Sequence, residues 1–195
     1  IVGGIFSALE PLAFLAMALF AVYMYRKGEK SHPNKIALFW TIGASIVSFV
    51  GAGLLGFAHT LPQTNLYTHG TLVTAMHGHY AFWGAYAMIV LAIISYALPN
   101  LTGRKRYNNT SGHMAFWLSN VGMLGMTVAF GVAGVAQVYL ERKMKLDFMD
   151  VQNEIAIHFV VLLLCATLFT TGITLFIIEF IKYGKPTDEA LVKEE

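Results

Sequence analysis

Five long apolar runs limit the fold of this chain more than any other feature. Each run is long enough to cross a hydrocarbon layer of ~30 Å, which takes about 20 helical residues. None of them alternates polar and apolar residues, as the strands of a membrane barrel do. We therefore expect an all-α, polytopic membrane helix bundle that forms a single transmembrane domain over residues 1–195. The predicted helices cover residues 2–25, 36–58, 69–98, 113–139 and 153–182.

Composition supports the membrane class and excludes others. Of the 195 residues, 56% are hydrophobic and only 12% are charged, whereas about 25% are charged in soluble domains. The net charge of +2 comes with basic residues in short clusters, which excludes a nucleic-acid-binding protein. The chain starts at Ile1 without the basic region or cleavage site of a signal peptide. We expect it to be part of a longer polypeptide.

The basic residues predict the orientation in the membrane. If the five helices cross the bilayer in turn, ten of the 13 Lys and Arg residues share one side, which the positive-inside rule makes cytoplasmic. The C-terminus, with a charged tail over residues 186–195, is then cytoplasmic as well. The ten are Arg26, Lys27, Lys30, Lys35, Arg104, Lys105, Arg106, Lys182, Lys185 and Lys193, and the other side has Arg142, Lys143 and Lys145.

The third apolar run contains His77 and His79, separated by Gly78. Ionisable side chains inside a membrane segment are functional candidates, because their burial in hydrocarbon is costly. At about 100° per residue, the two imidazoles project roughly 200° apart and cannot chelate one ion together. Two flat haem groups, one on either side, fit this spacing better than a compact metal ion. The alternative is that both histidines hydrogen-bond to neighbouring helices or to water.

Two further polar residues are candidates for the same site. Glu10 lies in the first apolar run, where Pro11 is expected to kink the helix by clashing with the carbonyl of Ser7. A carboxyl group at a kink suits a proton relay or a metal-site partner, and a hydrogen-bonded structural glutamate is the alternative. His69 is predicted to begin the third helix at the outer interface, where it contacts a cofactor or only caps the helix.

The chain resembles a known family over two stretches. The run from Thr68 to Tyr86, THGTLVTAMHGHYAFWGAY, resembles the haem-bearing helix of the haem–copper oxidase superfamily. Together with the segment SALEPL that begins at Ser7, it resembles more narrowly the large catalytic subunits of cytochrome-c-dependent bacterial nitric oxide reductases. This resemblance covers almost the whole chain, and it implies the last five of the family's twelve transmembrane helices.

The resemblance implies a role for each candidate residue. His77 matches the axial ligand of the high-spin haem b3, and His79 matches one of two axial ligands of the low-spin haem b. Glu10 matches a glutamate beside the non-haem iron, and His69 matches a position near the haem propionates. The other ligands of the non-haem iron belong to helices that this chain does not contain, so the N-terminal helices of the same subunit or a second polypeptide have to supply them.

The function implied by the resemblance is reduction of two nitric oxide molecules to nitrous oxide and water. Its electrons come from a membrane-anchored cytochrome c subunit, in the bacterial inner membrane, with the haem sites toward the periplasm. A calcium ion between subunits is a further cofactor that the resemblance raises. Two alternatives remain: an oxygen-reducing oxidase of the same superfamily, with copper in place of the second iron, and a cofactor-free transporter or structural membrane subunit.

Overall fold

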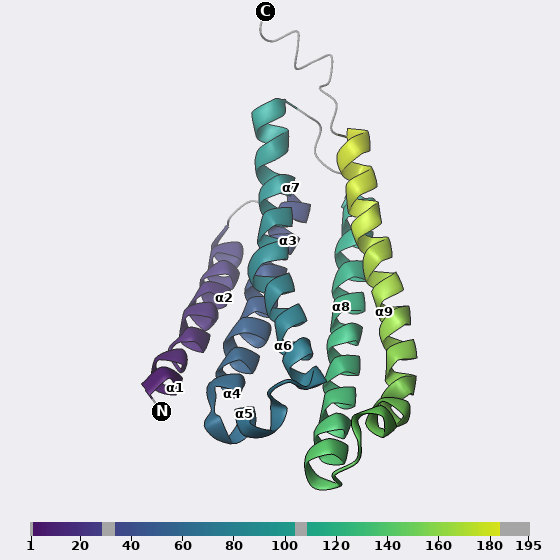
Figure 1. Ribbon diagram of the computed structural model, residues 1–195. Helices are drawn as coiled ribbons and strands as arrows, with labels where there is room; N and C mark the ends of the chain where they lie inside the picture. The colour runs from purple at the N-terminus through teal and green to yellow at the C-terminus, as the bar shows by residue number, and fades with distance from the viewer. Residues whose placement is uncertain (1, 29–33, 104–108, 184–195) are drawn as a thin grey trace, which may run out of the picture.

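The computed structural model describes residues 2–28, 34–103 and 109–183, and within these ranges it is helical without any strand. Five helices long enough to cross a membrane lie side by side and run in alternating directions (Figure 1). The prediction of an all-α membrane helix bundle is thereby confirmed. The predicted tail, residues 186–195, lies outside the described residues. The spans are Ile5–Lys27, Lys35–Thr60, Leu72–Leu101, Thr110–Lys143 and Phe148–Lys182.

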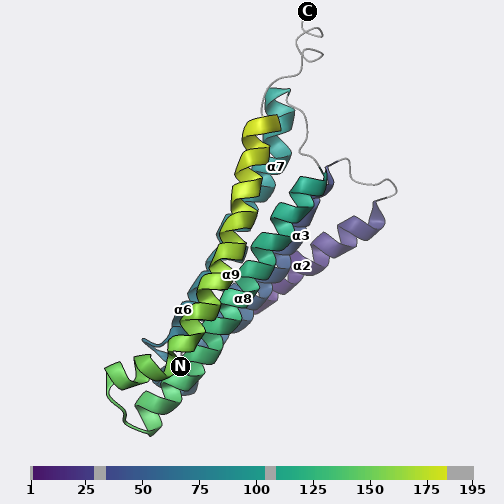
Figure 2. The ribbon, with the colours of Figure 1, turned by 90° about the vertical axis from the view of Figure 1, so that its right-hand side faces the viewer.

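The first span is broken where the sequence predicts a kink. Helix α1 (Val2–Ser7) ends in a turn, and α2 (Glu10–Lys27) begins directly after it. Pro11 occupies the first turn of α2, where its missing N–H leaves no hydrogen bond unmade. It is also the buried residue of α2, which leans away from the other helices toward its C-terminal end (Figure 2).

The second and third spans each contain a π-helical segment. In the second, α3 (Lys35–Ser48) continues into the π-helix η1 (Phe49–Leu55) and then α4 (Gly56–Thr60). In the third, α6 (Leu72–Phe82) continues into the π-helix η2 (Trp83–Ala87) and then α7 (Met88–Thr102). Such segments are rare and often lie at functional sites.

The third span begins later than predicted, at Leu72 and not at His69. The short helix α5 (Pro62–Thr68) precedes it, and the His69 N–H donates to the Asn65 carbonyl at the end of that helix. Gly70 then adopts a φ of 74°, a left-handed conformation that glycine tolerates without strain. The Thr71 hydroxyl accepts a hydrogen bond from the Val73 N–H, which fixes the start of α6. The apolar periodicity did not reveal this turn.

The fourth and fifth spans form the most extensive helix–helix interface of the bundle. They are α8 (Asn109–Val138), extended by the π-helix η3 (Tyr139–Lys143), and α9 (Phe148–Tyr183). The last helix starts five residues before the predicted position 153. A Cβ at Gly122 would lie 2.5 Å from the Phe169 backbone nitrogen, so the two backbones touch there.

Trp40 of α3 joins four elements in the core. Its ring is fully buried and meets Trp83 of η2, Phe116 of α8 and Phe176 of α9 edge-on, at centroid distances of 6.0, 5.1 and 5.8 Å. Edge-to-face contacts of this kind add to the packing energy of the rings. The π-helix η2 is therefore held against α3, α8 and α9 immediately after the segment that carries His77 and His79.

The close approach of α8 and α9 yields a first testable prediction. Replacing Gly122 with Ala places a methyl group against the Phe169 backbone, which cannot move as a flexible side chain does. We expect a destabilisation of about 1–3 kcal/mol, measured as a lower midpoint of thermal unfolding of the purified protein. Val121→Ala, at an exposed position of the same helix, is the control, and equal midpoints for both variants would contradict the prediction.

Candidate functional site

Helix α6 lies between two neighbours that approach its backbone through glycines. On one side, a Cβ at Gly51 of η1 would lie 2.8 Å from the Tyr80 carbonyl carbon and oxygen. On the other side, a Cβ at Gly134 of α8 would overlap the Val73 backbone nitrogen, whereas one at Gly131 would meet only the Met76 side-chain sulfur, at 2.8 Å. Small residues permit such backbone contact between membrane helices. The helix that carries both histidines is thus fixed from two sides.

His77 faces η1 and α4. Its Nδ1 lies 3.0 Å from the Gly51 carbonyl oxygen, which can only accept a hydrogen bond. The neutral ring therefore carries its proton on Nδ1 and keeps the lone pair on Nε2, which is the nitrogen left for a metal. A Cβ at Gly56 would lie 3.3 Å from Cε1 of His77, so this glycine leaves room for the half-buried ring. The fixed orientation is that of metal-ligating histidines, whose second nitrogen donates to a carbonyl.

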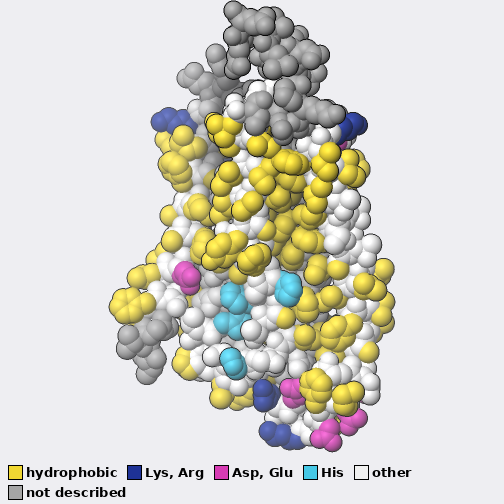
Figure 3. Space-filling view, turned by 45° about the horizontal axis from the view of Figure 1, so that its top comes forward, with side chains coloured by type: hydrophobic (Ala, Val, Ile, Leu, Met, Phe, Trp, Pro, Cys, Tyr) yellow, Lys and Arg dark blue, Asp and Glu magenta, His cyan; other side chains and the backbone are white. Residues whose placement is uncertain are grey.

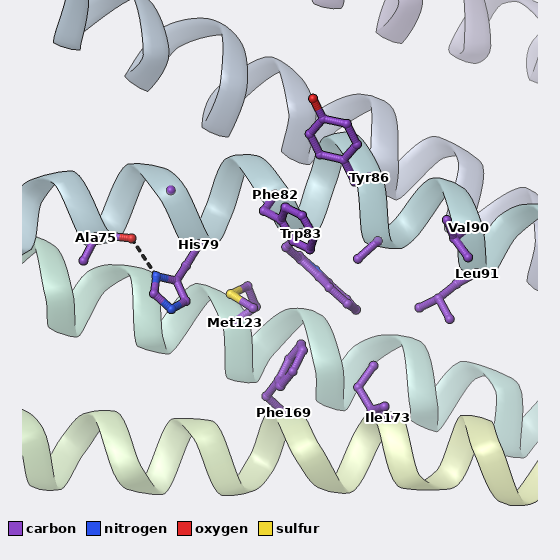
Figure 4. Close-up of a pocket in the computed structure, with 12 residues that line it drawn as sticks. Ala75, His79, Phe82, Trp83, Tyr86, Val90, Leu91, Met123, Phe169 and Ile173 are labelled. Atoms are coloured by element: carbon purple, nitrogen blue, oxygen red, sulfur yellow. Dashed lines mark hydrogen bonds between the residues drawn. The ribbon is translucent and has the colours of Figure 1, made fainter.

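His79 points to a different neighbour, α8. Its ring packs on Phe130 at a centroid distance of 4.9 Å, and its Nδ1 lies 2.8 Å from the Ala75 carbonyl of its own helix (Figure 4). The same tautomer argument leaves Nε2 with a free lone pair. The prediction that His77 and His79 leave one helix toward different partners agrees with these contacts.

A cavity of about 830 Å³ opens beside His79. Its volume falls within the range of small-molecule and cofactor pockets, and its walls are almost entirely apolar. In Figure 4, Trp83, Met123 and Phe169 extend into it from η2, α8 and α9. The lining residues are Ala75, Gly78, His79, Phe82, Trp83, Tyr86, Ala87, Val90, Leu91, Met123, Phe169 and Ile173.

One polar contact supports the wall of this cavity. The buried Trp83 indole donates to the Asn120 side-chain oxygen at 3.1 Å, and the Asn120 amide nitrogen donates in turn to the Phe116 carbonyl. The indole plane is therefore held by α8. Gly78, also at the cavity, has nothing within 4 Å of its ideal Cβ position, which leaves open space between the two histidines.

The structure places the other two candidates at the same end of the bundle. Glu10 is exposed at the start of α2. The next residue, Pro11, lies against η1, because a Cβ at Gly53 would be 3.1 Å from the Pro11 Cα. Glu10 is thus joined through Pro11 to the segment that holds His77. His69 is exposed in the turn before α6, and the Arg142 guanidinium lies 3.5 Å from its carbonyl oxygen.

The sequence predicts that His59 ends the second helix on the same outer side, but it does not predict that His59 lies against His77. Their ring centroids are 5.0 Å apart with an interplanar angle of 33°. Figure 3 shows several histidine side chains near one another on one face of the molecule. No local pattern connects residues 18 positions apart on different helices, so only the fold reveals this pair.

The arrangement fits haem better than a compact metal ion. Among the described residues, no group of three or more His, Cys, Asp or Glu side chains is placed to hold a metal ion. Each of His77 and His79 instead offers one nitrogen on a separate side, and His79 does so beside a large apolar cavity. A flat macrocycle that needs one axial imidazole from a helix is compatible with this donor set. A non-haem iron site is not, because its ligands are absent from the described part of the chain.

Comparison with known proteins shows the family of this chain. The family model of cytochrome c and quinol oxidase polypeptide I matches residues 1–168. A nitric oxide reductase subunit from Stutzerimonas stutzeri is 42% identical over 192 residues. The alignment covers 94% of this chain and 40% of that protein, so the chain spans about two fifths of its relative. With five membrane helices and a family match over most of its length, the chain belongs to the cytochrome c and quinol oxidase polypeptide I family, the haem–copper oxidases.

Proposed function

We propose that this chain is part of the large subunit of a nitric oxide reductase. The reaction is the two-electron, two-proton reduction of two nitric oxide molecules to nitrous oxide and one water. The observation that carries the proposal is the pair of imidazoles on α6, each with Nδ1 tied to a backbone carbonyl and Nε2 left for a metal. The similarity to the nitric oxide reductase subunit of Stutzerimonas stutzeri supports this branch of the family.

In this proposal the two histidines hold different haems. His77 would hold the high-spin haem b3, and His79 would hold the low-spin haem b in the cavity beside it. His69 lies near the haem propionates. When bound, haem supplies the one-electron chemistry. The residues of α6 orient the ligands, and the apolar walls around His79 exclude water from the low-spin site.

The second metal requires residues from elsewhere. Because the described residues contain no set of metal-binding side chains, the ligands of a non-haem iron have to come from the N-terminal helices or a second polypeptide. Glu10 then acts as a nearby carboxyl that holds a proton or balances the charge of the metal centre. A calcium ion at a subunit contact belongs to the same proposal.

The proposed location is the bacterial inner membrane, with the histidine end toward the periplasm. Arg26, Lys27 and Lys35 lie at the opposite end of the bundle from His69, as the positive-inside rule requires of the cytoplasmic side. A membrane-anchored cytochrome c subunit on the periplasmic side is the proposed electron donor. It would face the end of the bundle where α4, α5 and the connection between η3 and α9 lie.

The haem ligands are tested by separate alanine variants. In the purified complex, we expect His79→Ala to lose the low-spin haem signal and His77→Ala to lose the high-spin signal, because each removes one axial nitrogen. Reduced-minus-oxidised spectra measure the two signals, and pyridine haemochrome spectra measure the total b-type haem. His158→Ala serves as the control, since its Nδ1 lies 3.2 Å from the Ile155 carbonyl of its own helix. An unmodified complex without b-type haem would refute the proposed function.

The role of Glu10 is tested by Glu10→Gln. This change keeps the shape of the side chain and removes its ability to exchange a proton. We expect turnover of nitric oxide to fall by about 10²–10⁴-fold, as for loss of a general acid–base group, while both haem spectra remain. Turnover equal to that of the unmodified enzyme would reduce Glu10 to a structural residue.

An oxygen-reducing oxidase is the second candidate, because the matching family model covers cytochrome c and quinol oxidases in general. The two candidates differ in the second metal, for which an acidic neighbour such as Glu10 favours the harder iron ion over copper. We expect metal analysis of the whole complex to find non-haem iron and no stoichiometric copper. Copper at one atom per complex would favour the oxidase instead.

A further inference from the structure

Gln137 of α8 makes a long-range hydrogen bond to the first residue of the histidine helix. Its side-chain oxygen accepts from the Leu72 N–H at 2.9 Å, across 65 residues of sequence. The Leu72 N–H belongs to the first turn of α6, where backbone donors have no partner within the helix. Gln137 is only 5% exposed, so this contact is shielded from competing water.

A second contact sets the orientation of the same amide. The Gln137 nitrogen donates to the Glu141 carboxylate at 2.8 Å. Because the Leu72 N–H can only donate and a carboxylate accepts, the amide has one orientation that satisfies both neighbours. Glu141 belongs to η3, and so does Arg142, whose guanidinium approaches the His69 carbonyl. Glu141 and Arg142 of η3 thereby both contribute to holding the segment that leads into α6.

Glycine packing and this hydrogen bond together fix the position of α6 along α8. Gly134 lies one helical turn before Gln137, and its backbone touches Val73 and Leu72. The Thr71 hydroxyl, at the N-cap of α6, accepts a hydrogen bond from the Val73 N–H. The adjacent N–H groups of Leu72 and Val73 are thus bonded by two different side chains, one from α8 and one from the N-cap. A slide of α6 along α8 would break the Gln137 bond and force the Gly134 contact apart at once.

We infer that Gln137 is a positioning residue for the two imidazoles of the haem helix, oriented by Glu141. Leu72 precedes His77 by five residues and His79 by seven, or about 7.5 and 10.5 Å along one rigid helix. A displacement at Leu72 is therefore transmitted to both histidines together. This inference rests on the proposed function, because the imidazoles have to act as haem ligands for their position to matter.

The inference is tested in the purified complex with Gln137→Leu, which removes both hydrogen bonds. We expect both haems to be retained, with a shift in the electron paramagnetic resonance g-values of the low-spin haem. The iron–histidine stretching frequency of the high-spin haem is expected to shift as well. Glu141→Gln keeps an acceptor for the Gln137 amide and is expected to match the unmodified complex. Gln152→Leu, the same change on α9, is the control.

Glu141→Leu covers the case in which Gln137→Leu does not assemble. It leaves the Leu72 contact possible but removes the group that orients the amide, so we expect a smaller shift of the same two signals. The inference would be overturned if Gln137→Leu lowered the thermal stability but left both signals unchanged. If Gln137→Leu does not assemble, the same result in Glu141→Leu would overturn it. If the unmodified complex contains no b-type haem, the proposed function itself fails.

Discussion

Backbone contact around α6 is the constraint on which the rest of the site depends. Glycines at positions 51 and 134 bring η1 and α8 against the main chain of α6 from two sides. In a lipid environment, helix association relies on such close packing, because burial of apolar side chains gains little there. Side chains at these glycines would push the neighbours outward, and the carbonyl that fixes His77 would move away with η1.

The same constraint explains why two chemically identical side chains differ in their surroundings. His77 projects into the narrow space between α6 and η1, where a carbonyl and a second imidazole surround it. His79 projects toward α8 and a wide apolar cavity. A single residue, Gly78, separates the two histidines in sequence. The helix α6 therefore lies between the polar surroundings of His77 and the apolar surroundings of His79.

The features that local chemistry determines are predictable from the sequence. Hydropathy over about 20 residues predicts the five spans, Pro11 predicts the break in the first span, and the angular step of a helix predicts the divergence of His77 and His79. Features that depend on distant partners were not predictable. The Gln137–Leu72 hydrogen bond joins residues 65 positions apart, and the π-helices and the turn at Gly70 alter backbone geometry without changing the apolar pattern. This is why the predicted start of the third helix at His69 was wrong.

Placing both imidazoles on one continuous helix also fixes the distance between them. Two residues of α-helix contribute about 3 Å of rise, and this spacing does not change when neighbouring helices shift, because both side chains move with the same rigid body. The rate of electron tunnelling decays exponentially with distance. The rate between groups on two separate helices would therefore change with every relative motion of those helices. In the function proposed above, an electron path between haems held by His77 and His79 keeps the spacing that their shared helix sets.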